Sequence, residues 1–405
     1  MKVLGVIILH PLRKTHGAII AGYELSKEIS KVMPYTLAMM WDKNETYYDD
    51  NLEVVRFRCN NPFTLFIKLL PRWAYVPLYS SKIPDYIGQG NFDLVHIHSF
   101  IPTFAIKRIA KKCRQKGIPY CISAHGFTEF LDFSKIHKFG TLKSILIYFS
   151  LKRPFLYVIK NASWIFTLSP NDGKVLEKLN FPEEQSSCVT NGVKQVYLEK
   201  PLEPEIESIK NKLGLKHDKN SILLFVGSLY IYKGIDTFIS CLNYISYPVT
   251  AVIGGKFKSN VEKNDLLKHV NNISKEKHRI IFTGWLSEAE LRSLFHVADI
   301  LVYPTRGDSL PLVILEAMAC YCPVISTEIG GIPFQLANGA GFIASPPTPE
   351  IFAQIADKLI KTPGLRKKVS LAARKRIDEL FNWRTAAQDA IKGYKQILSI
   401  NDANI

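Results

Sequence analysis

The sequence lacks a long apolar run, and its cysteines form no ordered set. No stretch reaches the roughly 18 uncharged apolar residues that a membrane-spanning helix needs, so we expect no transmembrane segment. The seven cysteines are scattered, and Cys320 and Cys322 are the only close pair. No second pair completes a zinc site. We therefore expect reduced and mostly buried thiols, which are typical of a cytosolic protein.

The sequence also lacks a recognisable secretion signal, a low-complexity segment and a short-period repeat. Residues Val3–Leu9 are apolar, but this run is short, a single lysine precedes it and no cleavage-like site follows it. We expect the run to be a buried first strand. The expected location of the protein is the cytoplasm.

Acidic residues are in short supply. The chain has 36 Asp and Glu against 52 Lys and Arg, a net charge of +16. Residues 1–200 carry 27 basic against 16 acidic side chains, and the remainder 25 against 20, so most of the excess lies in the first half. Such a field favours nucleotides, phospholipid head groups or nucleic acid as partners. No nucleic-acid-binding module is recognisable, so we do not expect nucleic acid to be the partner.

What the sequence does contain is a regular alternation of short apolar and longer amphipathic runs. This alternation predicts an α/β fold, with parallel sheets covered by helices on both faces. The strand-like runs are Lys2–Leu9, Leu94–Ile97, Tyr120–Ser123, Trp164–Leu168, Ile222–Val226, Val249–Ile253, Ile280–Thr283, Ile300–Tyr303 and Val324–Thr327. Helical patterns follow several of them, at Gly22–Val32, Thr103–Lys116, Asn171–Leu179, Ile235–Ile245, Glu288–Val297, Pro311–Cys320 and Pro349–Lys361.

The series runs twice, so the chain of 405 residues is expected to form two doubly wound halves. The break falls near Lys200–Pro204, a charged stretch with prolines that suits a linker. Ligands of such sheets bind beyond the carboxyl ends of the strands. Candidate site residues are therefore sought in the loops that follow strands.

The stretch "DSLPLVILEAMA", residues 308–319, places two acids around a helix start. Pro311 disfavours helical backbone at Leu310, so we expect the helix to begin at Pro311 with Leu310 as its N-cap. Leucine offers no capping atom, which leaves the amides of Leu312 and Val313 available to an anion unless the side chain of Asp308 or Ser309 reaches over them.

Glu316 lies inside this apolar helix, and Asp308 stands just ahead of it. A buried carboxylate needs a partner. The pattern leaves two candidates open for Glu316: a pair of sugar hydroxyls, or a nearby Arg or Lys in a structural ion pair.

Two further loops contain candidates for phosphate binding. In "FVGSLYIYKGIDTFI", residues 225–239, Lys233 opens a helix and can reach a diphosphate as a point charge, although a lysine at a loop is often only solvated. In "HGAIIAG", residues 16–22, Gly17 would let the backbone approach a phosphate, or it simply forms a turn.

Three histidines follow or occupy strands of the first half. His125 in "CISAHGFTEF" comes just after a strand, where it would face a ligand or be satisfied within its loop. His96 and His98 alternate on a strand and share one face. Without a third ligand at suitable spacing, they favour a structural role over a metal site.

Taken together, these strings resemble the GT-B retaining glycosyltransferases of glycosyltransferase family 4 (glycosyl transferases group 1). "DSLPLVILEAMA" is similar to the family's E-x7-E motif, "TEIGGIP" follows it as in the family, and "VGSLYIYKG" is similar to the phosphate-binding loop. "FTGWLSEAELRSLFHVADILVYPT" resembles the segment between them, and "DLVHIHS", "SAHGF", "TLSP" and "VTNGV" stand in the first half where the family has such strings. Their order and spacing carry the resemblance.

The resemblance implies two facing Rossmann-like domains with a cleft between them. Residues 1–198 would form the N-terminal acceptor domain, and residues 199–384 the C-terminal nucleotide-sugar donor domain. A last helix, about 385–405, would cross back to the first domain. The family transfers a sugar from a nucleotide donor with retention of configuration, without a metal or cofactor, and this sequence contains no D-x-D motif. The donor expected is a UDP- or GDP-linked hexose.

The resemblance also implies roles for single residues. Lys233 would hold the donor diphosphate with Ser228 and Gly17 nearby, and Glu316 would bind the ribose hydroxyls. Asp308 and His125 would contact the donor sugar at the reacting centre. Backbone amides would help at Leu310, Pro311, Leu312 and Val313 (proline contributing no donor), and main-chain atoms at Trp285 would meet the base.

Three residues depart from the family's pattern. The first acid of the motif is Asp308 rather than Glu, so its reach is one methylene shorter. Ser228 stands where many members have a phosphate-binding Arg, which leaves Lys233 with less help unless Arg306 compensates. Tyr321 follows the helix where Gly is usual, at a position that often requires a positive φ.

The acceptor is expected to bind the first half, as a glycan or a lipid-linked molecule. Basic side chains stand beside aromatics in residues 61–79 and 142–160, and residues 106–117 place Lys107, Lys111 and Arg114 on one helical face. This composition suits an interfacial helix on an anionic membrane surface, with the protein peripheral to the inner face of the cell membrane. An ordinary solvated basic face is the other interpretation, and the sequence leaves both open.

Two other functions compete with glycosyl transfer. One is a sugar-nucleotide epimerase on the same fold, and the other a non-catalytic binder of sugar nucleotides or nucleic acid. The charge of +16 and the absence of Arg at position 228 favour the binder, whereas the order and spacing of the motifs favour the transferase.

Overall fold

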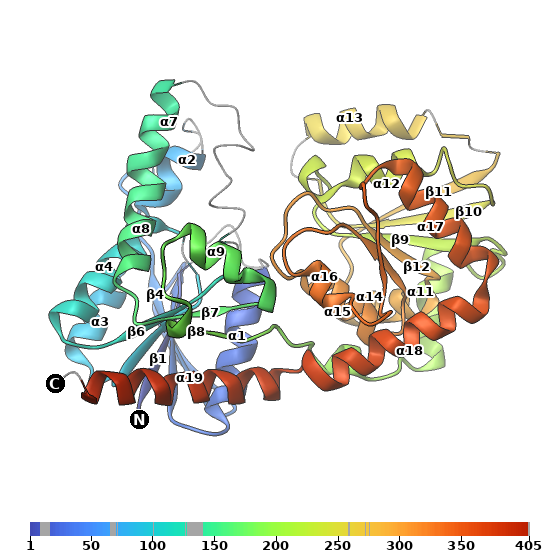
Figure 1. Cartoon of the computed structure of the whole chain (residues 1–405). Helices are drawn as coiled ribbons and strands as arrows, with labels where there is room; N and C mark the ends of the chain where they lie inside the picture. The colour runs from blue at the N-terminus through green and yellow to red at the C-terminus, as the bar shows by residue number, and fades with distance from the viewer. Residues whose placement is uncertain are drawn as a thin grey trace. The chain divides into compact units, whose positions relative to one another are not determined.

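The computed structural model describes residues 1–8, 17–64, 70, 72–99, 101–125, 127, 141–257, 260–271, 273–274 and 276–403. The chain divides into two compact units (Figure 1). Unit 1 consists of Met1–Asn191 and Trp383–Ile405, and unit 2 of Gly192–Asn382. The boundary between the units thus falls between residues 191 and 192, whereas the sequence placed it between 198 and 199.

Unit 1 is built on an eight-stranded sheet of order β3-β4-β2-β1-β5-β6-β7-β8. All neighbouring strands pair in parallel except β3 and β4, which are antiparallel. The strands are β1 (Val3–Ile7), β2 (Tyr35–Trp41), β3 (Glu45–Asp49), β4 (Leu52–Arg58), β5 (Leu94–Ile97), β6 (Tyr120–Ser123), β7 (Trp164–Thr167) and β8 (Ser186–Cys188).

The helices of unit 1 cover both faces of this sheet. They are α1 (Gly17–Ser30), α2 (Arg72–Tyr75), η3 (Val76–Leu78), α3 (Ile83–Gln89), α4 (Thr103–Gln115), α7 (Thr141–Ile147), the π-helix η4 (Tyr148–Lys152), α8 (Arg153–Lys160), η5 (Pro170–Asp172), α9 (Gly173–Lys178), η6 (Glu183–Gln185) and α19 (Trp383–Ala403). Successive residues of a strand face opposite sides. Val95 and Ile97 of β5 therefore join the apolar core with α3, α4 and α8, whereas His96 points to the side where α1 and α19 pack together.

The last helix, α19, belongs to unit 1 although it follows all of unit 2 in the sequence. The Tyr394 hydroxyl lies 2.6 Å from Nδ1 of His96. Gly393 packs so closely on Phe166 that an added Cβ would lie 2.5 Å from the ring. The structure thus adds to unit 1 a helix that starts at Trp383, close to the expected start at about residue 385.

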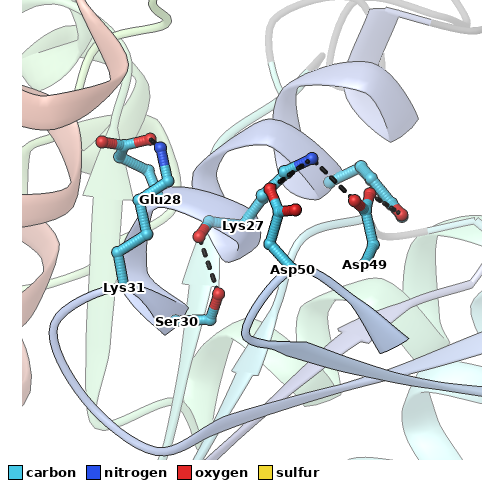
Figure 2. A network of polar contacts seen from close by, with 7 residues as sticks. Lys27, Glu28, Ser30, Lys31, Asp49 and Asp50 are labelled. Atoms are coloured by element: carbon cyan, nitrogen blue, oxygen red, sulfur yellow. Dashed lines mark hydrogen bonds and ion pairs between the residues drawn. The ribbon is translucent and has the colours of Figure 1, made fainter. Parts of the chain in front are cut away.

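Polar contacts join α1 to the turn between β3 and β4 (Figure 2). Lys27 Nζ lies 2.7 Å from Asp49 and 3.1 Å from Asp50, and the Tyr23 hydroxyl donates to Asp49 at 2.6 Å. The hydrogen bonds from Lys27 and Tyr23 lower the pKa of Asp49. Glu28, near the end of α1, pairs with Lys31 just after the helix, at 2.7 Å. This network fixes the edge hairpin of the sheet to the first helix.

Unit 2 has a six-stranded parallel sheet of order β11-β10-β9-β12-β13-β14. Its strands are β9 (Ser221–Val226), β10 (Val249–Gly254), β11 (His278–Gly284), β12 (Ile300–Tyr303), β13 (Val324–Ser326) and β14 (Phe342–Ile343). Its helices are α10 (Gln195–Leu198), α11 (Glu203–Leu213), η7 (Ile231–Lys233), α12 (Ile235–Cys241), α13 (Asn260–Asn271), α14 (Glu288–Val297), α15 (Leu312–Ala319), α16 (Ile332–Gln335), α17 (Pro349–Lys361) and α18 (Pro363–Leu380).

The strand order of unit 2 reverses between β9 and β12. In a doubly wound sheet the connections from such a pair leave in opposite directions, and a crevice opens at the carboxyl ends of the two strands. The comparable reversal in unit 1 lies between β1 and β5.

Some expected elements differ from the observed ones. The linker expected at Lys200–Pro204 extends too far, because its last two residues are helical. Helix α11 begins at Glu203 and has Pro204 in its first turn, where proline is favoured. The apolar run Tyr35–Trp41, with no polar alternation to mark it, is strand β2 and was missed. Edge strands β3, β8 and β14 are short or polar and were missed as well.

Candidate functional site

Three loops meet at the carboxyl edge of the unit 2 sheet. They follow β9 (residues 227–234), β12 (304–311) and β13 (327–331). Gly234 has φ +78°, and a Cβ there would lie 1.9 Å from the Pro304 carbonyl oxygen. Gly330 has φ +57°, and a Cβ there would lie 2.3 Å from the Asp308 carbonyl oxygen. Glycine at these two positions allows the three backbones to touch at the reversal between β9 and β12.

Lys233 and Asp308, predicted separately, lie in direct contact. The Lys233 ammonium forms an ion pair with Oδ1 of Asp308, and the two side chains are only 19% and 14% exposed. Oδ2 of Asp308 accepts hydrogen bonds from the Tyr303 hydroxyl at 2.9 Å and from Thr305 Oγ1 at 2.7 Å. Burial is the main cause that raises the pKa of Tyr303, so its hydroxyl stays protonated and donates. Asp308 is thus held by β12 and its loop, and it holds Lys233 in turn.

Helix α15 begins beside this pair. It starts at Leu312, and Pro311 is the N-cap, with φ −67° and ψ 126°. The sequence predicted Pro311 as the first helical residue and Leu310 as the cap, which is one residue too early. The physical conclusion holds, since the N-cap provides no side-chain hydrogen bond. Leu310 and Pro311 are buried, while Leu312 and Val313 remain partly accessible.

Glu316 lies one turn into α15 and keeps part of its surface accessible. Burial of the carboxyl raises its pKa to about 7. The positive charge of Lys194 opposes this shift, and the negative charge of Glu288 adds to it. Lys194 is paired with Glu288 at 2.6 Å. Within the described part of the chain, the Glu316 carboxylate has no ion pair and no hydrogen bond. The structural ion pair left open by the sequence is therefore not formed there.

Arg306 does not replace the arginine missing at position 228. Its guanidinium forms a bidentate pair with Asp236, at 2.8 and 2.7 Å, and donates to Thr237 at 3.0 Å. It also donates to the Ile231 carbonyl. These contacts fasten the loop after β12 to the start of α12. Ser228 is exposed in the loop after β9.

Trp285 follows β11, an edge strand of the sheet, and its side chain is 58% exposed. The Lys256 ammonium lies 5.6 Å from the centre of its ring. Trp285 and Lys233 both follow the carboxyl ends of their strands, β11 and β9. Because β10 lies between these two strands, Trp285 is not in contact with the Lys233–Asp308 pair.

Unit 1 contains the other two predicted residues, His125 and Gly17. His125 follows β6 and is 9% exposed. Burial is the main cause that lowers the pKa values of His96 and His98, that of His98 to about 3. Electrostatic repulsion from His125 lowers both pKa values further. Gly17 is the first residue of α1. The structure therefore brings together Lys233, Asp308 and the α15 start in unit 2, whereas His125 and Gly17 belong to unit 1.

His96 and His98 are fully buried, with ring centres 3.9 Å apart. Hydroxyl groups surround them: Tyr394 and Ser123 at His96, and Tyr35 at His98, at 2.6, 2.8 and 3.0 Å. The described residues include no group of three or more His, Cys, Asp or Glu side chains that could hold a metal ion. No helix in the described ranges is long and apolar enough to cross a bilayer.

Sequence reasoning missed Tyr303 and Thr305, which orient Asp308. The spacing from Thr305 to Asp308 is a signal that could have revealed one of them, because hydroxyls and carboxylates three residues apart often join within a turn. Tyr303 closes β12 and looks like any buried aromatic strand residue. Nothing in the sequence distinguishes its hydroxyl.

Comparison with known families agrees with this geometry. Residues 205–376 match the family model of glycosyl transferases group 1, and residues 38–195 match the model of glycosyltransferase family 4. An uncharacterized glycosyltransferase of Methanocaldococcus jannaschii is 24% identical over 76% of this chain and 76% of its own length. The D-inositol 3-phosphate glycosyltransferase of Frankia alni is 28% identical, over 46% of this chain and 48% of its own length.

Solved structures share the fold. HepE of Anabaena, in complex with UDP, aligns with a TM-score of 0.75 at 18% identity, over 98% of this chain and 100% of HepE. Sucrose-phosphate synthase from Thermosynechococcus elongatus aligns with a TM-score of 0.76 at 18% identity, over 99% and 100% of the two chains. The two family models together span most of both units. The fold is GT-B, and the chain belongs to the glycosyltransferases of family 4, glycosyl transferases group 1.

Proposed function

We propose that this protein transfers a hexose from a nucleotide-diphosphate donor to a glycan or a lipid-linked acceptor, with retention of configuration and without a metal ion or cofactor. The observation that carries the proposal is Glu316. It is an acid in an apolar helix whose pKa is raised to about 7, and it lacks an ion-pair partner in the described residues. A carboxylate that the fold leaves unpaired is suited to a ligand that provides hydroxyl donors.

The surrounding groups suit the rest of a nucleotide-diphosphate sugar. Lys233 supplies a positive charge, and the α15 amino end supplies backbone donors and the positive end of a helix dipole. Together they would bind the diphosphate and stabilise it as a leaving group. Glu316 would bind the ribose, and Trp285 would contribute main-chain atoms to the base. The solved HepE complexes contain UDP and UDP-glucose, which makes UDP sugars the first donors to test.

Asp308 has two roles in this proposal. In the free protein it neutralises and positions Lys233, as their ion pair indicates. When the donor enters, the diphosphate competes for the ammonium, and Asp308 becomes free to accept a hydrogen bond from the sugar. His125 and Gly17 would complete the site by analogy with the family, His125 at the reacting carbon. Ser228 would contact the diphosphate in place of the arginine found in many members.

The acceptor is proposed to bind unit 1, whose sequence carries most of the excess positive charge. A lipid-linked acceptor would place the protein in the cytoplasm, at the inner face of the cell membrane. Nucleic acid is not part of the proposal.

A panel of nucleotide sugars tests the donor. Each compound is added to the purified protein, and the thermal unfolding midpoint is measured; a ligand at one hundred times its Kd adds about 2.7 kcal/mol to the stability of the folded state. We expect one base and sugar to shift the midpoint most, and Glu316→Gln to abolish this shift. The matched variant Glu276→Gln, which changes an exposed acid, should keep it. An unchanged ligand response in Glu316→Gln would refute the assignment of the ribose site.

Product analysis separates transfer from the competing functions. With the stabilising donor and candidate acceptors, transfer releases a nucleotide diphosphate and adds a sugar to the acceptor. An epimerised donor without release of nucleotide would identify an epimerase. Donor binding with neither product would identify a non-catalytic binder.

A further inference from the structure

Helices α7, η4 and α8 of unit 1 expose apolar side chains to solvent. Ile147, Leu151 and Phe155 are buried, spaced four residues apart, and form the inward face of this helical run. The outward face carries Ile145, Leu146, Tyr148 and Phe149, which are 49, 49, 45 and 52% exposed. A helix at a water-exposed surface normally places polar residues opposite its buried stripe.

This concentration of exposed apolar side chains is specific to one place. Elsewhere in the described chain, large exposed apolar residues occur singly or in pairs. Scattered residues of that kind need no explanation, whereas a contiguous patch marks an interaction site. Two of its residues lie in the last turn of α7, and the other two, Tyr148 and Phe149, lie in η4, a π-helix over Tyr148–Lys152. Such helices are rare and occur frequently at functional positions.

Positive charge surrounds the patch. Residues 101–125 and 141–160 contain no Asp or Glu. Lys152, Arg153 and Lys160 are exposed on the same helical run as the apolar patch, and the Arg153 guanidinium lies 5.6 Å from the Phe149 ring centre.

Helix α4 extends this basic surface. It packs against α8 and exposes Arg108, Lys111 and Arg114. The Thr103 hydroxyl at its start donates to the Ser150 carbonyl of η4 at 2.7 Å, which joins the two segments. In Figure 1, α7 and α8 follow each other as one helical run, with α4 beside α8.

We propose that this face of unit 1, α7–η4–α8 with the basic side of α4, docks on the surface of an anionic lipid bilayer. The four apolar side chains would enter the boundary between head groups and acyl chains, and the lysines and arginines would contact the anionic head groups. A second copy of the chain fits this face poorly, because two such faces would oppose only positive charges. A purely polyanionic partner leaves the apolar patch without a role.

The proposal is independent of the donor chemistry, since it concerns lipid binding. It also gives the proposed acceptor a place: a lipid-linked acceptor lies in the same bilayer surface to which unit 1 would bind. A protein that binds anionic vesicles but no donor would contradict the proposed reaction alone. A protein that binds the donor but no vesicles would contradict this inference alone.

Vesicle flotation tests the docking face. The full chain is mixed with vesicles of phosphatidylcholine alone or with added phosphatidylglycerol. We expect flotation only with the anionic vesicles, and less of it at high salt. The double variant Leu146→Ser/Phe149→Ser should lower the partition coefficient at least about tenfold, because both apolar anchors are lost. Lys152→Gln/Arg153→Gln should lower it by about ten- to thirtyfold.

The matched control is Tyr244→Ser/Leu371→Ser, which removes two exposed apolar residues of unit 2 and should leave flotation unchanged. The folded state of each variant is checked by its thermal midpoint and by the donor-induced shift. Equal binding to neutral and anionic vesicles, or unchanged flotation of both unit 1 variants, would overturn the proposal. So would a dimer that dissociates in Leu146→Ser/Phe149→Ser, or binding of single-stranded RNA that depends on all four substituted residues.

Discussion

At the scale of single residues, the two acids of "DSLPLVILEAMA" have opposite environments. Asp308 is fully engaged, by Lys233, Tyr303 and Thr305. Glu316, eight positions later in the same stretch, is desolvated without such partners, and its pKa is raised to about 7. Asp308 is therefore fixed in position by protein contacts, whereas the buried Glu316 carboxylate makes the protein less stable until a ligand binds.

Glu316 should make the stability of the free protein depend on pH. Its pKa is about 7 in the folded protein, against an ordinary value of 4.5. Between these values the folded protein holds a proton that the unfolded chain has released, so the free energy of unfolding falls as the pH rises through this window. We expect Glu316→Gln to be more stable than the native chain by about 1–3 kcal/mol at pH 8. The gain at pH 5 should be much smaller.

Denaturant titrations of the free protein at the two pH values measure this difference. A substitution that destabilises equally at pH 5 and pH 8 would show that the carboxylate has a stabilising partner in solution.

The Lys233–Asp308 pair should be coupled energetically. Both side chains are mostly buried, so removing one leaves the other charge uncompensated. In a double-mutant cycle of Lys233→Met and Asp308→Asn, we expect a coupling of about 1–3 kcal/mol in the free energy of unfolding. The exposed pair Lys375 and Glu379, 3.7 Å apart, is the control and should couple by less than about 0.5 kcal/mol. Additive effects at Lys233 and Asp308 would contradict their contact.

At the scale of elements, the site depends on loops that touch through glycine. The loop after β9 can pass the loop after β12 only because Gly234 has no Cβ and adopts a positive φ. Tyr321, just after α15, also has a positive φ, +59°, without being glycine. The sequence identified this position as one that often requires it. The Arg374 guanidinium lies 5.4 Å from the Tyr321 ring centre, and this contact helps to offset the cost of the strained backbone.

Gly234→Ala should separate the β9 and β12 loops. The added methyl would overlap the Pro304 carbonyl and strain the backbone at φ +78°, so we expect a loss of about 2–4 kcal/mol in stability and a weaker response to the donor. Gly364→Ala, in the first turn of α18 with open space around it, is the control. It should be neutral or stabilise by up to about 1 kcal/mol. Thermal midpoints of the two variants distinguish these outcomes, and equal effects would rule out the close approach.

At the scale of the whole molecule, the chain returns to its first unit through α19. The buried imidazole of His96 accepts or donates at Tyr394 on one side and at Ser123 on the other. Burial lowers the pKa of His96 well below its usual value, so the ring is neutral at physiological pH and needs both partners.

Tyr394→Phe should destabilise unit 1 by about 1–3 kcal/mol, because Nδ1 of His96 loses its hydrogen-bond partner in a water-free place. Tyr48→Phe removes a hydroxyl from a side chain of the same unit that is 70% exposed, and it should have little effect. Hydrogen exchange at the amides of β5 and β6 reports on unit 1 directly. If protection there is equal in both variants, α19 does not secure the sheet through this contact.

The sequence alone determined the alternation of elements and the candidate loops, because the hydrophobic period and the residues after each strand are local signals. The GT-B fold was implied by the resemblance of its motifs to glycosyltransferase family 4. The sequence also located Lys233, Asp308 and Glu316. It could not tell that Lys233 and Asp308 share one ion pair or that Arg306 is already engaged with Asp236, since these contacts join residues about 70 positions apart.

Only the tertiary structure decided which acids, bases and aromatics are free to act. Glu316 forms no ion pair within the described chain, and Lys194, the cation that acts on it electrostatically, is paired with Glu288 instead. Ile145, Leu146, Tyr148 and Phe149 remain outside the core because the inward face of their helix is already taken by Ile147, Leu151 and Phe155. A linear sequence specifies which side chains are apolar or charged, but burial and pairing depend on what the fold brings against them.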